Sequence, residues 1–143
     1  MESRNNYVDL AGTLAGKPVS SHSGRDGDSV VEYYTFPLQI TRLSGTSDTV
    51  NVNAAKNLLD DTELTGEGDR VAVRGELRTF NNKSGEGAKL VVSVFAREIE
   101  LSDSDEHNLI VLRGTICKPP NLRRTPMGRE ICDLMLAVNR RYD

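Results

Sequence analysis

The sequence contains few of the residues that would mark it as a membrane, secreted or disulfide-stabilised protein. It has no tryptophan, two cysteines and 5% aromatic residues among its 143 residues. No apolar run approaches the roughly 18 residues of a membrane-spanning helix, and the first residues lack the apolar core of a secretory signal. Two cysteines are too few for a disulfide scaffold. We therefore expect a protein of the reducing cytoplasm with no membrane partner.

The remaining composition is that of a globular protein with an uneven distribution of charge. Hydrophobic residues make up 37% of the chain, charged residues 27%, and the net charge is -3, which argues against coating nucleic acid by bulk charge alone. Residues 1–101 hold 11 Lys and Arg against 15 Asp and Glu, a net of -4, whereas residues 107–143 hold 7 against 3, a net of +4. The acidic segment between them, 102–106, predicts a linker.

Two blocks of sequence recur in the same order on the two sides of this acidic segment. Residues 8–14 align with 110–116 at an offset of 102, and residues 32–42 align without gaps with 130–140 at an offset of 98. Two ordered matches favour an internal duplication. The second copy stops at Asp143, well before its counterpart ends, so we expect one complete unit and the opening of another.

Alternating apolar and polar residues, the pattern of half-buried strands, fill five segments of the first unit. The predicted strands are 8–14, 34–41, 49–53, 70–77 and 89–100. Alanine and leucine between the third and fourth strands predict a short helix at 54–60. This order favours a five-stranded Greek-key OB barrel over an SH3-like barrel, and Gly12 and Gly75 suit its tight bends. Pro37 requires a sheet edge or a bulge, because it cannot donate to the ladder.

The expected fold class is therefore all-β, a Greek-key OB barrel followed by an incomplete second OB unit that begins as a β-hairpin. The expected bounds are 1–101 for the OB domain, 102–106 for the linker and 107–143 for the truncated unit. A hairpin alone is marginal in water. Its apolar face must be covered by the same segment of another chain, by the first barrel's edge, or by a natural continuation of the sequence, which we favour. That face consists of Ile110, Leu112, Ile116, Leu134, Leu136 and Val138.

Five segments together resemble the bacterial and phage single-stranded DNA-binding proteins. The second copy has the family's opening pattern at 112–114, 120–128 and 136–142, and the first copy has its closing pattern at 68–79 and 98–101. The resemblance implies an OB fold, homo-oligomerisation, and sequence-tolerant binding of single-stranded DNA in replication, recombination or repair. Replication or recombination proteins are further partners that it implies.

Binding of this kind requires cations along the phosphates and flat groups on which bases stack, each base contributing about 1–3 kcal/mol. Stacking groups are scarce: Asn51 and Asn53 occupy the third strand where the family usually has aromatics, which leaves Tyr33, Phe80 and Tyr142. The predicted nucleic-acid-binding residues are Arg42, Lys56, Arg74, Arg78, Phe80, Arg113, Arg123, Arg124, Arg129, Arg140, Arg141 and Tyr142.

Each of these residues also has a structural interpretation. Arg74 and Arg78 alternate outward on a strand, where arginines are often only solvated, and Phe80 fits the barrel core as well as a stacking role. In residues 107–143, seven basic residues over 37 positions exceed what solubility needs. Nucleic-acid binding is therefore predicted more strongly for the basic second unit than for the first.

The sequence predicts no enzyme, no metal site and no cofactor. Gly24–Asp28 is rich in glycine but lacks the Lys-Ser/Thr ending of a phosphate loop, so it predicts a flexible hairpin connection. The cysteines Cys117 and Cys132, with His22 and His107, lack the spacing of zinc ligands. No Ser/His/Asp set can be nominated.

Two functions remain open at this point. The first is a single-stranded DNA-binding module whose basic second unit supplies much of the affinity. The second is an OB-fold protein-interaction or oligomerisation module of a replication or mobile-element complex, with little DNA affinity of its own. Binding that weakens steeply with salt would favour the first.

Overall fold

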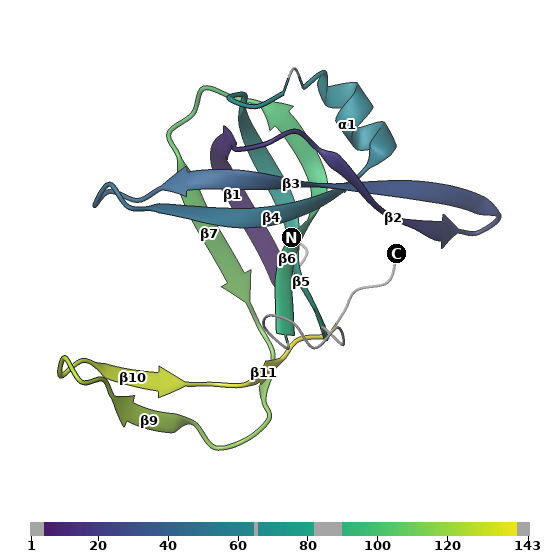
Figure 1. The fold of residues 1–143 in the computed structure, drawn as a ribbon. Helices are drawn as coiled ribbons and strands as arrows, with labels where there is room; N and C mark the ends of the chain where they lie inside the picture. The colour runs from purple at the N-terminus through teal and green to yellow at the C-terminus, as the bar shows by residue number, and fades with distance from the viewer. Residues whose placement is uncertain (1–4, 65, 82–89, 140–143) are drawn as a thin grey trace. The chain divides into compact units, whose positions relative to one another are not determined.

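The computed structural model describes residues 5–64, 66–81 and 90–139, which form eleven strands and one short helix (Figure 1). Contacts between residues divide these ranges into two units, one of residues 7–110 and one of the remainder. The elements up to residue 101 are β1 (Asn6–Leu14), β2 (Val19–Asp26), β3 (Ser29–Thr41), β4 (Ser47–Ala55), α1 (Lys56–Thr62), β5 (Arg70–Asn81) and β6 (Leu90–Leu101). The later elements are β7 (His107–Leu112), β8 (Thr115–Ile116), β9 (Asn121–Arg124), β10 (Glu130–Asp133) and β11 (Leu136–Ala137).

The all-β prediction is confirmed, and each of the five expected strands is present with a short helix in the expected place. The sheet has the order β2-β3-β4-β6-β5-β1-β7, and an additional pairing of β3 with β1 closes the barrel. Within it, β4 and β6 run parallel, with Val52 opposite Val94. The fully buried side chains that fill the barrel are Val8, Leu10, Leu14, Phe36, Leu38, Val52, Val71, Val73 and Val94.

Strand β2 is an element that the sequence did not predict. Gly24–Asp28 was expected to be a flexible connection, but β2 pairs with β3 from Val19 to Asp26, and only Gly27, with a φ of 64°, and Asp28 form the turn. The described side chains of β2 are exposed or half-buried. Because β2 packs on no core, its sequence has no apolar alternation that would predict a strand.

Pro37 and Gly12 show how β3 is built to cross the barrel. On one edge, β3 pairs with β2 up to Thr35 and with β1 from Leu38 onward, so Pro37 falls between two partners where no ladder N–H is needed. Its carbonyl accepts a bond of 2.9 Å from the Ala15 N–H. Gly12 is required by the close crossing of β1 over β3, since a Cβ there would lie 2.4 Å from the Gln39 carbonyl oxygen.

The acidic segment expected to be a linker is hydrogen-bonded to the barrel. Glu106 accepts bonds from the Thr41 N–H at 3.0 Å and from the Thr13 hydroxyl at 3.4 Å. Arg70 donates to the Ser104 carbonyl at 2.9 Å. The following residue, His107, contacts the Asp9 carboxylate at 2.8 Å.

The second unit repeats the strand pairing of the first. Thr13 and Leu14 pair with Gln39 and Leu38 in the barrel, and the residues aligned with them pair in the same way, Thr115 with Ala137 and Ile116 with Leu136. The pairs Val19–Thr35 and Asn121–Asp133 also correspond. Gly114 even makes the close approach of Gly12, since its Cβ would lie 2.2 Å from the Ala137 carbonyl oxygen. These matched registers support the duplication; the domain bounds stay a prediction.

The apolar face expected on the second copy is exposed or half-buried in this chain. Ile116 is 53% exposed, Leu134 61% and Leu136 37%. No helix formed by the described residues has the length and hydropathy needed to cross a bilayer.

Candidate nucleic-acid interface

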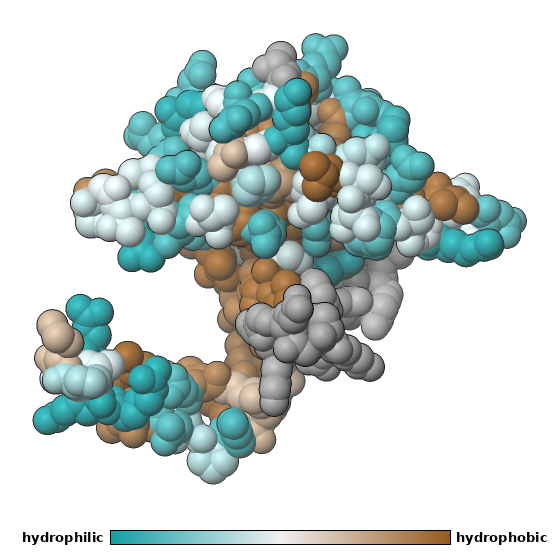
Figure 2. All heavy atoms as spheres, in the orientation of Figure 1, coloured by the Kyte–Doolittle hydropathy of each residue, from teal (hydrophilic) through white to brown (hydrophobic). Residues whose placement is uncertain are grey.

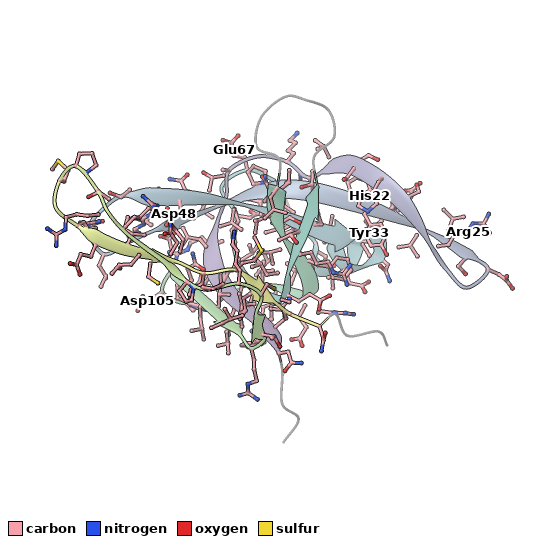
Figure 3. All side chains as sticks on the ribbon, turned by 90° about the horizontal axis from the view of Figure 1, so that it is seen from below. His22, Arg25, Tyr33, Asp48, Glu67 and Asp105 are labelled. Atoms are coloured by element: carbon pink, nitrogen blue, oxygen red, sulfur yellow. The ribbon has the colours of Figure 1, made fainter. Side chains whose placement is uncertain are left out.

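Three aromatic rings from three strands adjoin one another on the outer side of the barrel. Tyr33 on β3 lies beside His22 on β2, with ring centroids 4.9 Å apart and planes within 18°. Phe95 on β6 is 6.0 Å from Tyr33 at an interplanar angle of 53°. Figure 3 labels His22 and Tyr33 close together along the β2–β3 hairpin, with Arg25 nearer to its turn. We call these three rings the aromatic platform.

Two guanidinium groups and one carboxylate extend this platform. The Cζ of Arg78 lies over the Phe95 ring, 3.9 Å from its centroid, and the Cζ of Arg97 is 5.3 Å away. Both arginines donate to the Glu76 carboxylate, Arg97 at 3.2 Å and Arg78 through its Nε at 2.9 Å and also through its Nη2. Glu76 is only 8% exposed. The group has a net charge of +1 and includes the predicted residue Arg78.

A β-bulge in β6, where it pairs with β5, brings these residues together. The pairing register shifts between Arg74 and Gly75, which places Glu98 opposite Arg74 but Ala96 opposite Gly75. The extra residue at this bulge is Arg97. Gly75 permits the close contact, because a Cβ there would lie 1.9 Å from the Phe95 carbonyl oxygen.

Arg74, predicted to bind DNA, lies on β5 four residues before Arg78 and is paired with acidic side chains of β6. Its Nε donates to Glu98 at 3.1 Å and its Nη2 to Glu100 at 3.2 Å. The hydrogen bonds to Glu98 and Glu100 raise the pKa of Arg74 above its usual value. A phosphate would have to compete with two carboxylates for this guanidinium.

Two further predicted cations of the barrel are paired in the same way. Arg42, just after β3, donates to Asp48 at 2.8 and 2.6 Å, and these hydrogen bonds lower the pKa of Asp48. Lys56 at the start of α1 donates to Asp60 at 3.1 Å. Figure 3 shows Asp48 at the opposite end of β3 and β4 from His22, so Arg42 does not join the platform.

Three of the cations predicted in the second unit, Arg123, Arg124 and Arg129, lie on the β9–β10 hairpin or in its turn. Arg123 donates to Asp133 at 2.7 Å, and Arg124 donates to Glu130 at 2.9 Å. Arg129 is exposed, and its guanidinium has no partner among the described residues. Arg113 is exposed, just after β7, and its backbone N–H donates to the Asn5 carbonyl at 2.8 Å.

Four predicted site residues cannot be placed. Arg140, Arg141 and Tyr142 lie outside the described residues, and for Phe80 the structure gives only its backbone position in β5. Figure 2 shows the barrel surface around β3 and β4 as mostly hydrophilic, with apolar atoms in small groups. The candidate interface is therefore a small aromatic area in a surface of paired charges.

Comparison with solved structures identifies the family. The dimeric N-terminal domain of PriB protein from Thermoanaerobacter tencongensis is 31% identical, with a TM-score of 0.57, and the match covers 71% of this chain and all of that one. The chain belongs to the family of single-stranded DNA-binding proteins with an OB fold.

Other members of the single-stranded DNA-binding protein family match nearly the whole chain. The wild-type protein from Thermus aquaticus is 26% identical with a TM-score of 0.68, and the match covers 94% of this chain and 68% of that one. A deletion mutant of the same protein gives a TM-score of 0.69 at 26% identity, over 94% of this chain and 69% of that one. No family model matches the sequence, and no curated protein does.

Sequence reasoning about this family member missed two of the three rings of the platform and one of the two arginines beside it. Tyr33 was considered as a stacking residue, but Phe95 and Arg97 were not, and His22 was weighed only as a metal ligand. Phe95 stands between the core residues Val94 and Ala96, so the sequence shows a continuous apolar run with no sign of which residue faces outward. Among the described residues, no group of three or more His, Cys, Asp or Glu is placed to hold a metal ion.

Proposed function

We propose that this chain binds single-stranded DNA without sequence preference, by stacking bases on the aromatic platform of the first barrel. The observation that supports the proposal most is the convergence of His22, Tyr33 and Phe95 with the guanidinium groups of Arg78 and Arg97. Aromatic rings and guanidinium planes are the groups on which unpaired bases stack. Every base has such a face, so no particular sequence is required.

The charges of the barrel favour a stacking contribution over an ionic one. Arg42, Lys56 and Arg74 are each paired with carboxylates. A phosphate that takes one of these cations leaves a carboxylate free to bind a counterion, which offsets part of the gain from counterion release. We therefore expect a shallower salt dependence than the number of basic residues would indicate.

The proposed setting is replication, recombination or repair, with the chain acting as a homo-oligomer that binds DNA and catalyses no reaction. The related PriB domain is described as dimeric, and exposed apolar residues such as Ile116 and Leu134 offer area for association. Sedimentation at several concentrations tests the oligomer. A monomer at all concentrations would contradict it.

Fluorescence anisotropy with a labelled oligo-dT tests the DNA-binding proposal. Changing Phe95 or Tyr33 to leucine should weaken binding about 5- to 150-fold, the equivalent of 1–3 kcal/mol for one stacked base. Leu43→Ala is the matched control, since Leu43 is fully exposed in the turn after β3, and it should bind as the wild type does. If the wild type ignores oligo-dT at low salt but forms a stable complex with a protein, the alternative of an interaction module holds.

A further inference from the structure

We propose that the flat face offered to a base is the guanidinium of Arg78 stacked on Phe95, and that Glu76 is the positioning residue that fixes it there. This inference rests on the proposed DNA binding and specifies how one part of the platform performs it.

The contacts of Arg78 leave its flat face as the group it can offer. Its Cζ lies over the Phe95 ring, 3.9 Å from the ring centroid, which is van der Waals distance, so the guanidinium packs against the face of the ring. The Nε and Nη2 groups, which form one edge of the guanidinium, both donate to the same Glu76 oxygen. A guanidinium is planar and stacks on aromatic surfaces. With one face on Phe95 and one edge on Glu76, the opposite face remains for a base.

Glu76 is held so firmly that it can act as the anchor. It lies on β5 two residues before Arg78, so the contact needs no distant element to form. Its side chain is 10% exposed, and a carboxylate this buried is costly unless it is paired. Arg97 supplies a second pairing at 3.2 Å. Because the carboxylate accepts hydrogen bonds from two guanidiniums, its position is fixed.

The two arginines have different exposures, which points to different roles. The side chain of Arg78 is 29% exposed and that of Arg97 is 45% exposed. Among the described residues, the one hydrogen bond that the Arg97 guanidinium donates runs from its Nη2 to Glu76. Its other N–H groups are therefore available to a phosphate. Arg78 stacks the base, and Arg97 contacts the backbone next to it.

The substitution Glu76→Gln separates this role from simple electrostatics, because the two predict effects of opposite sign. Removing a negative charge beside a polyanion should tighten DNA binding. Removing the anchor of Arg78 should weaken it. Glu67→Gln is the matched control, since Glu67 is exposed and has no partner among the described residues. It removes the same charge without touching an arginine.

The readout is binding to two strands of equal length, oligo-dT and an abasic strand that has the phosphates but no bases. We expect Glu76→Gln to weaken binding to oligo-dT at least about fivefold, the low end for one stacked base, and to leave binding to the abasic strand within about twofold of wild type. Arg78→Lys keeps the charge and removes the plane, so it should show the same pattern. It also decides the matter if thermal melting shows that Glu76→Gln is unfolded.

The outcomes are distinguishable from a failure of the proposed function. If Glu76→Gln tightens binding to both strands as Glu67→Gln does, or if Arg78→Lys binds oligo-dT as tightly as wild type, the inference is wrong and DNA binding stands. A wild type that binds both strands equally also refutes it, because no base then stacks. If the wild type binds neither strand, the proposed function fails and the inference fails with it.

Discussion

Freeing Arg74 from its two carboxylate partners should make DNA binding more sensitive to salt. In the structure the Arg74 side chain is 32% exposed, and its guanidinium donates to Glu98 at 3.1 Å and to Glu100 at 3.2 Å. The double change Glu98→Gln and Glu100→Gln leaves it available to a phosphate. One additional phosphate contact steepens the log-log salt slope by about 0.7 for a single strand. Between 50 and 200 mM salt, this adds a loss of about 2.6-fold in affinity.

The assay is a series of anisotropy titrations with labelled oligo-dT at four salt concentrations. Wild type, the double variant and the double variant with Arg74→Gln should be compared. The third protein lacks the same two charges but has no guanidinium to release, so its slope should return to that of wild type. Thermal melting of each protein establishes that all three are folded. Such a cycle isolates the contribution of Arg74 from that of the charges around it.

Two results would refute this reasoning. An unchanged slope in the double variant would mean that no phosphate passes within reach of Arg74. A steeper slope that persists after Arg74→Gln would mean that the lost acidic charges act from a distance, without a specific contact. In either case the pairing of Arg74 with β6 would be structural only.

Three further predictions follow from single contacts. The hydrogen bond to Asp9 raises the pKa of His107, so this pair stabilises the fold fully below the unfolded pKa of about 6.5 and loses its effect as the pH rises through the raised folded pKa. The melting temperatures of wild type and His107→Gln should therefore differ most at low pH and converge at high pH. A difference in melting temperature that stays constant with pH would contradict this. Gly75→Ala should lower the free energy of unfolding, measured with urea, by about 1–3 kcal/mol, because the added Cβ meets the neighbouring strand. An unchanged urea midpoint would show that β5 and β6 can move apart to accept the Cβ at no cost. Arg129→Glu should weaken oligo-dT binding and reduce the salt slope by about 0.7, whereas equal titrations would remove Arg129 from the interface.

The barrel strands that pack the core were predictable from the sequence, whereas β2, which does not pack it, was missed. In β1 the buried Val8, Leu10 and Leu14 share one face, and that face imposes the period of two by which a strand is recognised. In β2 the corresponding constraint is absent, since its residues pair with β3 but cover no apolar interior. The sequence of β2 is therefore free to be polar, and only the structure reveals that it is a strand.

The candidate site was only partly predictable, because bulges decide which residues meet. Arg78 follows the alternation of β5 and was predicted to face outward, as found. Phe95 and Arg97 lie next to a register shift in β6, where counting by twos from either end gives conflicting faces. His22 reaches Tyr33 through a second shift, between Ser20 and His22 in β2. A polar strand has no hydrophobic alternation that a one-residue shift could interrupt, so such a shift cannot be recognised from the sequence.

That second bulge also explains why the two copies need not bind DNA in the same way. In the first copy, the extra residue in β2 sets His22 opposite Tyr33, and the two rings stack. In the second copy the pairing continues without a bulge and sets Arg123 opposite Ile131, with no ring on either strand. Stacking at this register is therefore a property of the first unit alone. The second unit offers guanidiniums there instead, so its contribution to binding should fall more steeply with salt than that of the first.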